Sequence, residues 1–362
     1  MTPAKTINTL LLAAALACCT ATAAAAQQTD TQWHVVRELP QKHFNRTIPK
    51  GNYSGITRLH DDVYAMVSDK SDSALYFNVR LYISKQTGEI LQAEWLGQQG
   101  RAEVKGLDNE AITRVSDNSV VIASEGKCRL KEYPLDDTPG GDGNTDGSDK
   151  LWGWAMPATD FYDNYNFESA TYDSLNHKLW TINESTMRRD GKPATPQDPH
   201  NNVLRLMAFD WAQRSATPET YLYRMDMPTT MKTPQTYAMG VSELCALPDG
   251  KLLVLEREAF VPKIKTGAFC NCKLYIADPA TFQPYAIDRP IEPGAPYVEK
   301  RLLKSWRTSL TLISQSWANY EGMCLGPTLE NGDQVVVLVS DSQDGYGGVL
   351  RDWFKTIVLS NK

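Results

Sequence analysis

The feature that most constrains this chain is a five-fold repeat of paired strand-like segments, each pair joined by a turn rich in Asp, Asn, Gly or Pro. A Glu opens the first segment in four copies, whereas the first copy has Ser54 at that place, and an acidic residue closes the second segment in all five. Asp-Gly and Asn-Gly turns between apolar runs, as at residues 249–250 and 331–332, are typical of β-hairpins. A supersecondary unit that recurs along a chain predicts a propeller or a solenoid. The opening acids are Glu110, Glu168, Glu243 and Glu321, and the closing acids are Asp69, Glu125, Glu184, Glu256 and Asp341.

The segments between the turns are rich in Val, Ile, Leu, Tyr and Trp, and helix signals are scarce. Four strands can be counted in a full repeat, but the last repeat ends one strand short at residues 354–359. The strand-like segment 33–39 precedes the first repeat, and we expect it to complete the last blade because an open sheet edge invites aggregation. The prediction is an all-β protein, a β-propeller of four-stranded blades with the ring closed by the N-terminal strand. Five blades are favoured, and six are the alternative because the long third and fourth intervals have room for a degenerate blade.

Residues 1–26 have the pattern of a secretory signal peptide, with Lys5 as the only charge, an apolar run at 10–17 and small residues at 23–26. Residues 27–362 are then predicted to be a single β-propeller domain, exported to the periplasm or the cell exterior. Cys18 and Cys19 follow Leu-Ala, which leaves a lipid anchor open as an alternative. We expect no transmembrane segment, because no other apolar run approaches the roughly 20 residues that a membrane helix needs. The net charge of −6 makes a nucleic-acid partner unexpected.

Metal sites built on cysteine or histidine are not favoured by this sequence. The five cysteines that remain after cleavage form no CxxC motif, and the five histidines do not cluster, so a hard cation with oxygen ligands fits better. The odd cysteine count leaves at least one thiol free or paired between chains, although an exported chain is able to form disulfides. Residues 142–147 match the first half of a calcium loop, but Gly153 stands where its bidentate Glu is needed, so a flexible polar loop is favoured.

The paired acids are expected to meet on one face of the propeller. Adjacent strands of a blade are antiparallel, so the start of the first strand and the end of the second lie at the same end of the blade. We therefore expect the four complete pairs to converge near the central channel. Carboxylates at short range raise each other's pKa, and a metal ion or nearby cations would relieve the repulsion. Basic residues stand just past four of the closing acids, and they are Lys70, Lys127, Arg188 and Arg257. The alternative is that the acids only cap strand ends or pair with cations of the neighbouring blade.

The sequence motifs of the repeats are similar to those of a known family. Residues 108–112 (DNEAI) with 122–126 (IASEG), 243–257 (ELCALPDGKLLVLER), and 320–323 (YEGM) with 337–342 (VLVSDS) resemble the phytase-like family of exported bacterial β-propellers. That family is also described as having an esterase-like phytase activity, and the resemblance covers roughly residues 50–360. It implies hydrolysis of phosphate esters. The first repeat departs from the pattern because it has Ser54 in place of an acid.

These observations lead to a metal-assisted phosphoesterase as the first hypothesis, acting on a small anionic ester. A divalent cation, with calcium favoured, is expected on Glu110, Glu168, Glu243 and Glu321. The catalytic candidates are Glu125, Glu184, Glu256 and Asp341, one of which would be the general base. Lys70, Lys127, Arg188 and Arg257 are the candidates for binding the substrate's phosphate. The alternatives are a non-catalytic exported binding protein, and an esterase or lactonase that uses the same ion.

Overall fold

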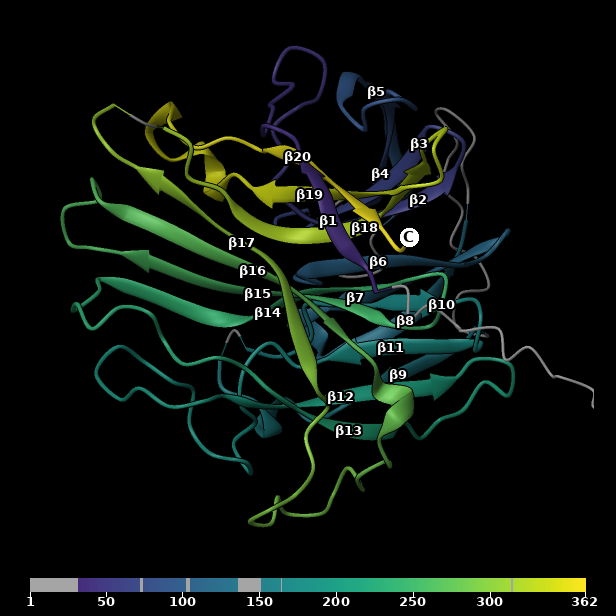
Figure 1. Ribbon diagram of the computed structural model, residues 1–362, viewed down its shortest axis with the longest axis vertical. Helices are drawn as coiled ribbons and strands as arrows, with labels where there is room; N and C mark the ends of the chain where they lie inside the picture. Colours follow the sequence, from purple (N-terminus) through teal and green to yellow (C-terminus); the bar gives the residue numbers. More distant parts are fainter. Residues whose placement is uncertain (1–31, 72–73, 102–104, 136–150, 164, 314) are drawn as a thin grey trace, which may run out of the picture. The chain divides into compact units, whose positions relative to one another are not determined.

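The computed structural model describes residues 32–362 except 72–73, 102–104, 136–150, 164 and 314 (Figure 1). The described residues from Gln32 onward cluster into one unit. The expected signal peptide, both of its cysteines and the expected calcium-type loop lie outside the described residues. Within the described part, no helix is long and apolar enough to cross a membrane.

The described residues are all-β, with five four-stranded antiparallel sheets and a few short 3-10 helices. We call them the first to fifth sheets in chain order. The first sheet holds β2 (Tyr53–His60), β3 (Val63–Ser68), β4 (Ala74–Ile83) and β5 (Ile90–Arg101). The second holds β6 (Asn109–Ser116), β7 (Ser119–Ser124), β8 (Arg129–Pro134) and β9 (Gly153–Ala155), and the third β10 (Thr171–Asp173), β11 (Lys178–Ile182), β12 (Val203–Asp210) and β13 (Glu219–Arg224). The fourth holds β14 (Thr236–Ala246), β15 (Leu252–Val261), β16 (Ala268–Ala277) and β17 (Lys300–Leu310), and the fifth β18 (Asn319–Thr328), β19 (Gln334–Asp341), β20 (Phe354–Ser360) and β1 (His34–Glu38). The 3-10 helices are η1 (Glu125–Lys127), η3 (Ala158–Asp160), η4 (Pro279–Thr281) and η5 (Gln343–Gly348).

The inner strands are apolar on both faces because each sheet is covered by its neighbours. Every residue of β3, β7 and β19 is buried. Four apolar cores lie between consecutive sheets, and a fifth lies between the fifth sheet and the first, where Val337 and Phe354 share a cluster with Ile56 and Met66. The first strands also touch in cyclic order, β2 with β6, β6 with β10, β10 with β14, β14 with β18, and β18 with β2.

The N-terminal strand pairs with the C-terminal strand, as the sequence predicts. β1 runs antiparallel to β20, with His34 opposite Ser360 and Glu38 opposite Ile357 (Figure 1). Glu38 adds two ion pairs, at 2.8 Å to Lys355 and 2.7 Å to Lys304. The strand that begins the described chain therefore completes the sheet that ends it. The long third and fourth intervals hold loops and η4, and the described residues form no further sheet there.

Candidate functional site

A β-bulge near the start of each first strand sets the geometry of the repeat. In the second sheet Asn109 faces Ser124 but Ala111 faces Ala123, so Glu110 is the extra residue on its strand. The same shift occurs in the first, fourth and fifth sheets. In the third sheet Phe167 faces Asn183 and Thr171 faces Trp180, so the register also changes by one residue between these two pairs. The equivalent bulge residues are Ser54, Glu110, Glu168, Ser242 and Glu321.

The register also fixes the equivalent positions at the end of the second strands. Ser124 faces the residue before the bulge in the second sheet, and Glu125 follows it; in the fourth sheet Glu256 holds the place of Ser124, so Arg257 is equivalent to Glu125. The five equivalent residues are Asp69, Glu125, Glu184, Arg257 and Asp341. Aligning Glu243 and Glu256 with the acids of the other repeats was therefore wrong by one residue in each strand. A one-residue slip matters because it moves a side chain to the other face of its sheet.

Because of this register, the side chain of Glu256 points away from the other acids of the repeat. Its carboxylate binds Lys300 at 2.5 Å and accepts a hydrogen bond of 2.8 Å from the Tyr223 hydroxyl. Arg257, the next residue, binds a different set of acids on the other face of β15. The expectation that Glu256 converges with the other acids is therefore incorrect.

Glu243 lies where the other sheets have a small residue, at the position of Gly55, Ala111 and Gly322. Its side chain is 1% exposed, and its Oε1 accepts hydrogen bonds from the backbone N–H of Leu244 at 2.9 Å and of Ala170 at 3.3 Å. Burial raises the pKa of Glu243 well above its usual range, although these amides lower it. Glu243 Oε1 thus binds backbone N–H groups in a strand-capping role, whereas Oε2 is buried without a hydrogen-bond partner.

The remaining predicted acids do come together, with one that sequence reasoning missed. We call them the acid group, and its members are Asp69, Asp108, Glu110, Glu125, Glu168, Glu184, Glu321 and Asp341. Burial and the charge of Glu168 raise the pKa of both Glu110 and Glu184 well above the usual range. Burial and neighbouring carboxylates also raise the pKa of Glu125 to about 8 and that of Asp341 to about 8.

Among the described residues, two cations form ion pairs with the acid group. Arg257 is 5% exposed, and its Nη2 lies 2.9 Å from Glu184 Oε1, 3.1 Å from Glu168 Oε2 and 3.7 Å from Glu321 Oε1. Lys70 forms an ion pair with Asp69. Two positive charges among eight carboxyl groups leave a strong excess of potential negative charge, so part of the group stays protonated unless another cation binds.

The donor atoms fit a hard divalent cation. Asp69, Asp108 and Glu110 each offer one ligand atom, and these atoms lie within 4.8 Å of one another. Asp69 Oδ1 is buried without a hydrogen-bond partner, and neither carboxylate oxygen of Glu184 has one, since its contact with Arg257 is an ion pair without hydrogen-bond alignment. Calcium and magnesium prefer oxygen ligands of this kind. Asp69, Asp108 and Glu110 are therefore the residues that would hold such an ion.

The other two predicted phosphate-binding cations are not in contact with the acid group. Arg188 Nε donates to the Phe161 carbonyl at 2.5 Å, and its guanidinium lies over the Tyr162 ring at 4.5 Å. Lys127 is exposed and forms no ion pair with any acid in the described part of the chain. The repeat pattern does not identify Asp108, because this residue precedes β6 and stands two residues before the bulge residue Glu110.

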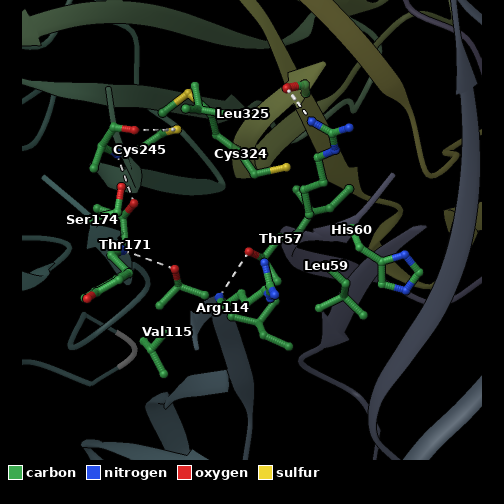
Figure 2. A pocket seen from close by; sticks show the side chains of 18 of the residues that line it. Thr57, Leu59, His60, Arg114, Val115, Thr171, Ser174, Cys245, Cys324 and Leu325 are labelled. Atoms are coloured by element: carbon green, nitrogen blue, oxygen red, sulfur yellow. Dashed lines mark hydrogen bonds between the residues drawn. The ribbon is translucent and has the colours of Figure 1, made fainter. Parts of the chain in front are cut away.

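At the other end of the first strands lies a cavity of about 670 Å³, lined by residues from the first strand of every sheet (Figure 2). Side chains join neighbouring sheets around it. Thr57 Oγ1 accepts from the Arg114 N–H at 3.2 Å, Thr113 Oγ1 from Tyr172 at 3.1 Å, and Thr171 Oγ1 from Ala246 at 2.9 Å. Cys245 and Cys324 hold the equivalent positions, and their sulfurs interact with the N–H groups of Leu325 and Arg58. Five equivalent contacts thus link each sheet to the next.

The comparisons with known proteins give one family and only distant structures. A family model described as "Phytase-like: Esterase-like activity of phytase" matches residues 48–343. No curated protein matches significantly. A streptogramin B lyase structure is 12% identical over 89% of this chain and 98% of its own, with a TM-score of 0.35. A virginiamycin B lyase from Staphylococcus aureus is 9% identical over 90% of this chain and 99% of its own, with a TM-score of 0.35. A putative 6-phosphogluconolactonase from Bacteroides uniformis is 12% identical over 84% of this chain and 85% of its own, with a TM-score of 0.34. At these TM-scores the likeness carries no weight for fold or activity.

Proposed function

The chain belongs to the phytase-like family described by an esterase-like activity, and we propose that it is an exported, metal-assisted phosphoesterase. The substrate is a small anionic ester, and the site is the acid group. The observation that carries the proposal is that ligand atoms of Asp69, Asp108 and Glu110 lie within 4.8 Å of one another. Lys70 pairs with Asp69, and Arg257 pairs with Glu184 in the same acid group. An all-carboxylate cluster with nearby Arg and Lys suits a divalent cation next to a phosphate.

The architecture that we propose is a five-bladed β-propeller whose last blade is closed by β1. The five apolar cores support it, because each lies between two sheets and the fifth lies between the last sheet and the first. The cyclic side-chain contacts of Thr57, Thr113, Thr171, Cys245 and Cys324 support it independently. In such a ring all five bulge residues come to one end of the first strands.

In this proposal the acids and the cations of the site have different roles. Asp69, Asp108 and Glu110 would hold the cation, for which calcium is favoured, and the ion would supply Lewis-acid chemistry. Lys70 and Arg257 bind and orient the phosphate charge. Glu168 and Glu184 fix the guanidinium of Arg257 through contacts of 3.1 and 2.9 Å.

Proton transfer falls to Glu125 or Asp341 in this proposal. Burial and neighbouring carboxylates bring the pKa of each to about 8. A pKa near the working pH lets a carboxyl group both take up and release a proton during a reaction. Glu125 is the more exposed of the two and is the better placed to meet a water molecule.

The test combines calcium binding with a panel of phosphomonoesters, including inositol phosphates. Calcium should raise the melting temperature by several degrees, because a ligand that binds only the folded state stabilises it. Glu110→Gln should abolish that rise and the turnover. Glu219→Gln is the matched control, since Glu219 is an exposed acid that pairs with Lys178 far from the acid group.

The outcomes separate the alternatives. Undiminished hydrolysis after Glu110→Gln, without any calcium response, would overturn the proposed function. A calcium response with no turnover of any ester would favour an exported binding protein, and turnover of carboxylic esters or lactones alone would favour an esterase or lactonase. Export is tested by the N-terminal sequence of the protein recovered from the producing cells, which should begin after residue 26 or, for a lipid anchor, at Cys18 or Cys19.

A further inference from the structure

A second cavity of about 570 Å³, which we call the side pocket, opens next to the acid group. Ser68 and Lys70 line it, and they flank Asp69 in the sequence. Asp344 also lines it and acts electrostatically on Asp69. We propose that the side pocket binds the alcohol component of the ester and selects a planar aromatic ring, so that the substrate class is an aryl phosphate. The substrate assignment rests on the proposed function, whereas the ring-binding pocket does not.

One wall of the side pocket is aromatic. Trp95 on β5 and Phe77 on β4 have ring centroids 5.4 Å apart with 35° between the ring planes, and Phe77 meets Tyr53 edge-on at 5.8 Å. Phe77 and Tyr53 are buried and belong to the apolar core, but Trp95 is only half-buried. Flat rings stack on such surfaces in offset or tilted arrangements. The core thus fixes the rear of the wall, and the indole is left available to a ligand.

A bulge in the first sheet lies beside this wall. Val79 faces Trp95 while Asn78 faces Gly97, so Leu96 is an extra residue on β5. Gly97 has a φ of 126°, and a Cβ there would meet no atom within 4 Å, so the backbone conformation rather than lack of space requires glycine. Bulges beside functional sites commonly re-aim side chains. Trp95 pairs with Val79 and therefore lies on the same face of the first sheet as Phe77, directly before the bulge.

Two lysines and one acid, Asp344, line the other side of the side pocket, so the cations that an anionic ester needs outnumber the acids there. Lys70 and Lys50 both line the pocket, and Lys50 forms no ion pair with the residues that the structure describes. The backbone nearby is held by Asn52, whose Oδ1 accepts from Ser342 Oγ and from the Asp344 N–H, each at 2.8 Å. A ligand with its anion at Lys70 and its ring on Trp95 contacts both the charged and the aromatic side of the pocket. An aliphatic polyol phosphate uses only the lysine side, because it has no ring to stack on Trp95.

The experiment measures binding of two non-hydrolysable probes to the purified full-length protein with calcium present. Phenylphosphonate and methylphosphonate carry the same anion and differ in the ring. The wild type should bind phenylphosphonate about tenfold more tightly, the factor that a stacking energy of about 1.4 kcal/mol gives. Trp95→Ala should remove most of this preference, and Trp95→Phe should retain part of it. Tyr82→Ala is the matched control, because Tyr82 is a partly exposed aromatic residue of β4 outside the pocket.

Each outcome decides a separate claim. Equal affinity of the wild type for the two probes, no binding of either, or an equal loss of both after Trp95→Ala would overturn the ring-binding pocket. A ring preference that depends on Trp95, together with no hydrolysis of phenyl phosphate, would keep the pocket and reject the phosphoesterase. Hydrolysis of inositol phosphates in preference to phenyl phosphate would keep the proposed function and reject the aryl substrate.

Discussion

Arg257 Nη2 lies 2.9 Å from Glu184 Oε1, and both side chains are almost completely buried. The two residues hold equivalent positions in the fourth and third sheets, because each directly follows the residue that faces the position before the bulge. The fourth sheet therefore supplies a guanidinium where the other four supply carboxylates. The same nitrogen also contacts Glu168 and Glu321, so one cation serves three acids from two other sheets.

Arg257→Gln should destabilise the protein by about 3–5 kcal/mol, because removing one partner of a buried ion pair leaves the others uncompensated. Urea denaturation gives the free energy of unfolding. Arg188→Gln is the control, since Arg188 is partly exposed and bonds mainly to a backbone carbonyl. A change below about 0.5 kcal/mol for Arg257→Gln would mean that protonation of the acids already balances the cluster.

The stability of the calcium-free protein should fall between about pH 5 and pH 8. Glu125 and Asp341 have folded pKa values of about 8, whereas such groups ionise near pH 4 in an unfolded chain. Between these values the folded state binds more protons than the unfolded state, so the free energy of unfolding decreases as pH rises. Melting temperatures measured with a chelator across this range test the sign.

Calcium should oppose that fall. The ion binds ionised carboxylates, so its stabilising effect should grow from pH 5 to pH 8. The difference in melting temperature with calcium and with chelator measures it. A chelated protein that becomes more stable toward pH 8, or a calcium effect that is largest at pH 5, would show that the acid group is already neutralised in another way.

The sequence was sufficient for the hairpins, because turn residues and strand periodicity are local signals. It was also sufficient for the pairing of β1 with β20, because the strand count left the last sheet one strand short. It was not sufficient for the register of the fourth repeat. A bulge adds one residue to β14, and the acidic side chain of Glu243 stands next to the true bulge residue Ser242. Nothing local distinguishes these two positions, since packing against neighbouring strands decides which residue is extra.

Glu243→Gln should change the free energy of unfolding by less than about 1 kcal/mol. Burial favours the neutral form of Glu243, and a neutral amide keeps the acceptor for the N–H groups of Leu244 and Ala170. Glu243→Ala should cost about 2–4 kcal/mol, because it leaves those donors unsatisfied and opens a cavity. Both variants should retain the calcium response. Loss of that response in Glu243→Gln, with normal stability, would return Glu243 to the metal ligands.

Deleting residues 27–40 should lower the melting temperature strongly and promote aggregation. The deletion exposes the edge of β20 and removes Glu38, the ion-pair partner of Lys355 and Lys304. Glu38→Gln separates the two causes, since it removes the charge but keeps the strand, and its effect should be much smaller. Thermal unfolding with light scattering gives both readouts. A truncated protein that melts at the wild-type temperature would show that β1 contributes nothing to closure.

The contacts around the larger cavity predict which substitutions the repeat tolerates. Thr171→Val keeps the shape of the side chain but removes the acceptor for the Ala246 N–H, which is a buried contact of 2.9 Å. Leaving a buried donor unsatisfied costs about 1–3 kcal/mol. Cys245→Thr and Cys324→Thr place the residue that three other sheets already have at the equivalent position, so they should be neutral within about 1 kcal/mol.

Denaturant unfolding of the three variants, each prepared alone, measures these differences directly. The result expected is a ranking in which Thr171→Val is clearly the least stable and the two cysteine variants match the wild type. If Thr171→Val is as stable as the wild type, the side-chain contacts between sheets are incidental, and the apolar cores alone hold neighbouring sheets together. If instead the cysteine variants unfold far more easily, the five positions are not equivalent, and the five-fold symmetry of these contacts fails where the fourth and fifth sheets meet their neighbours.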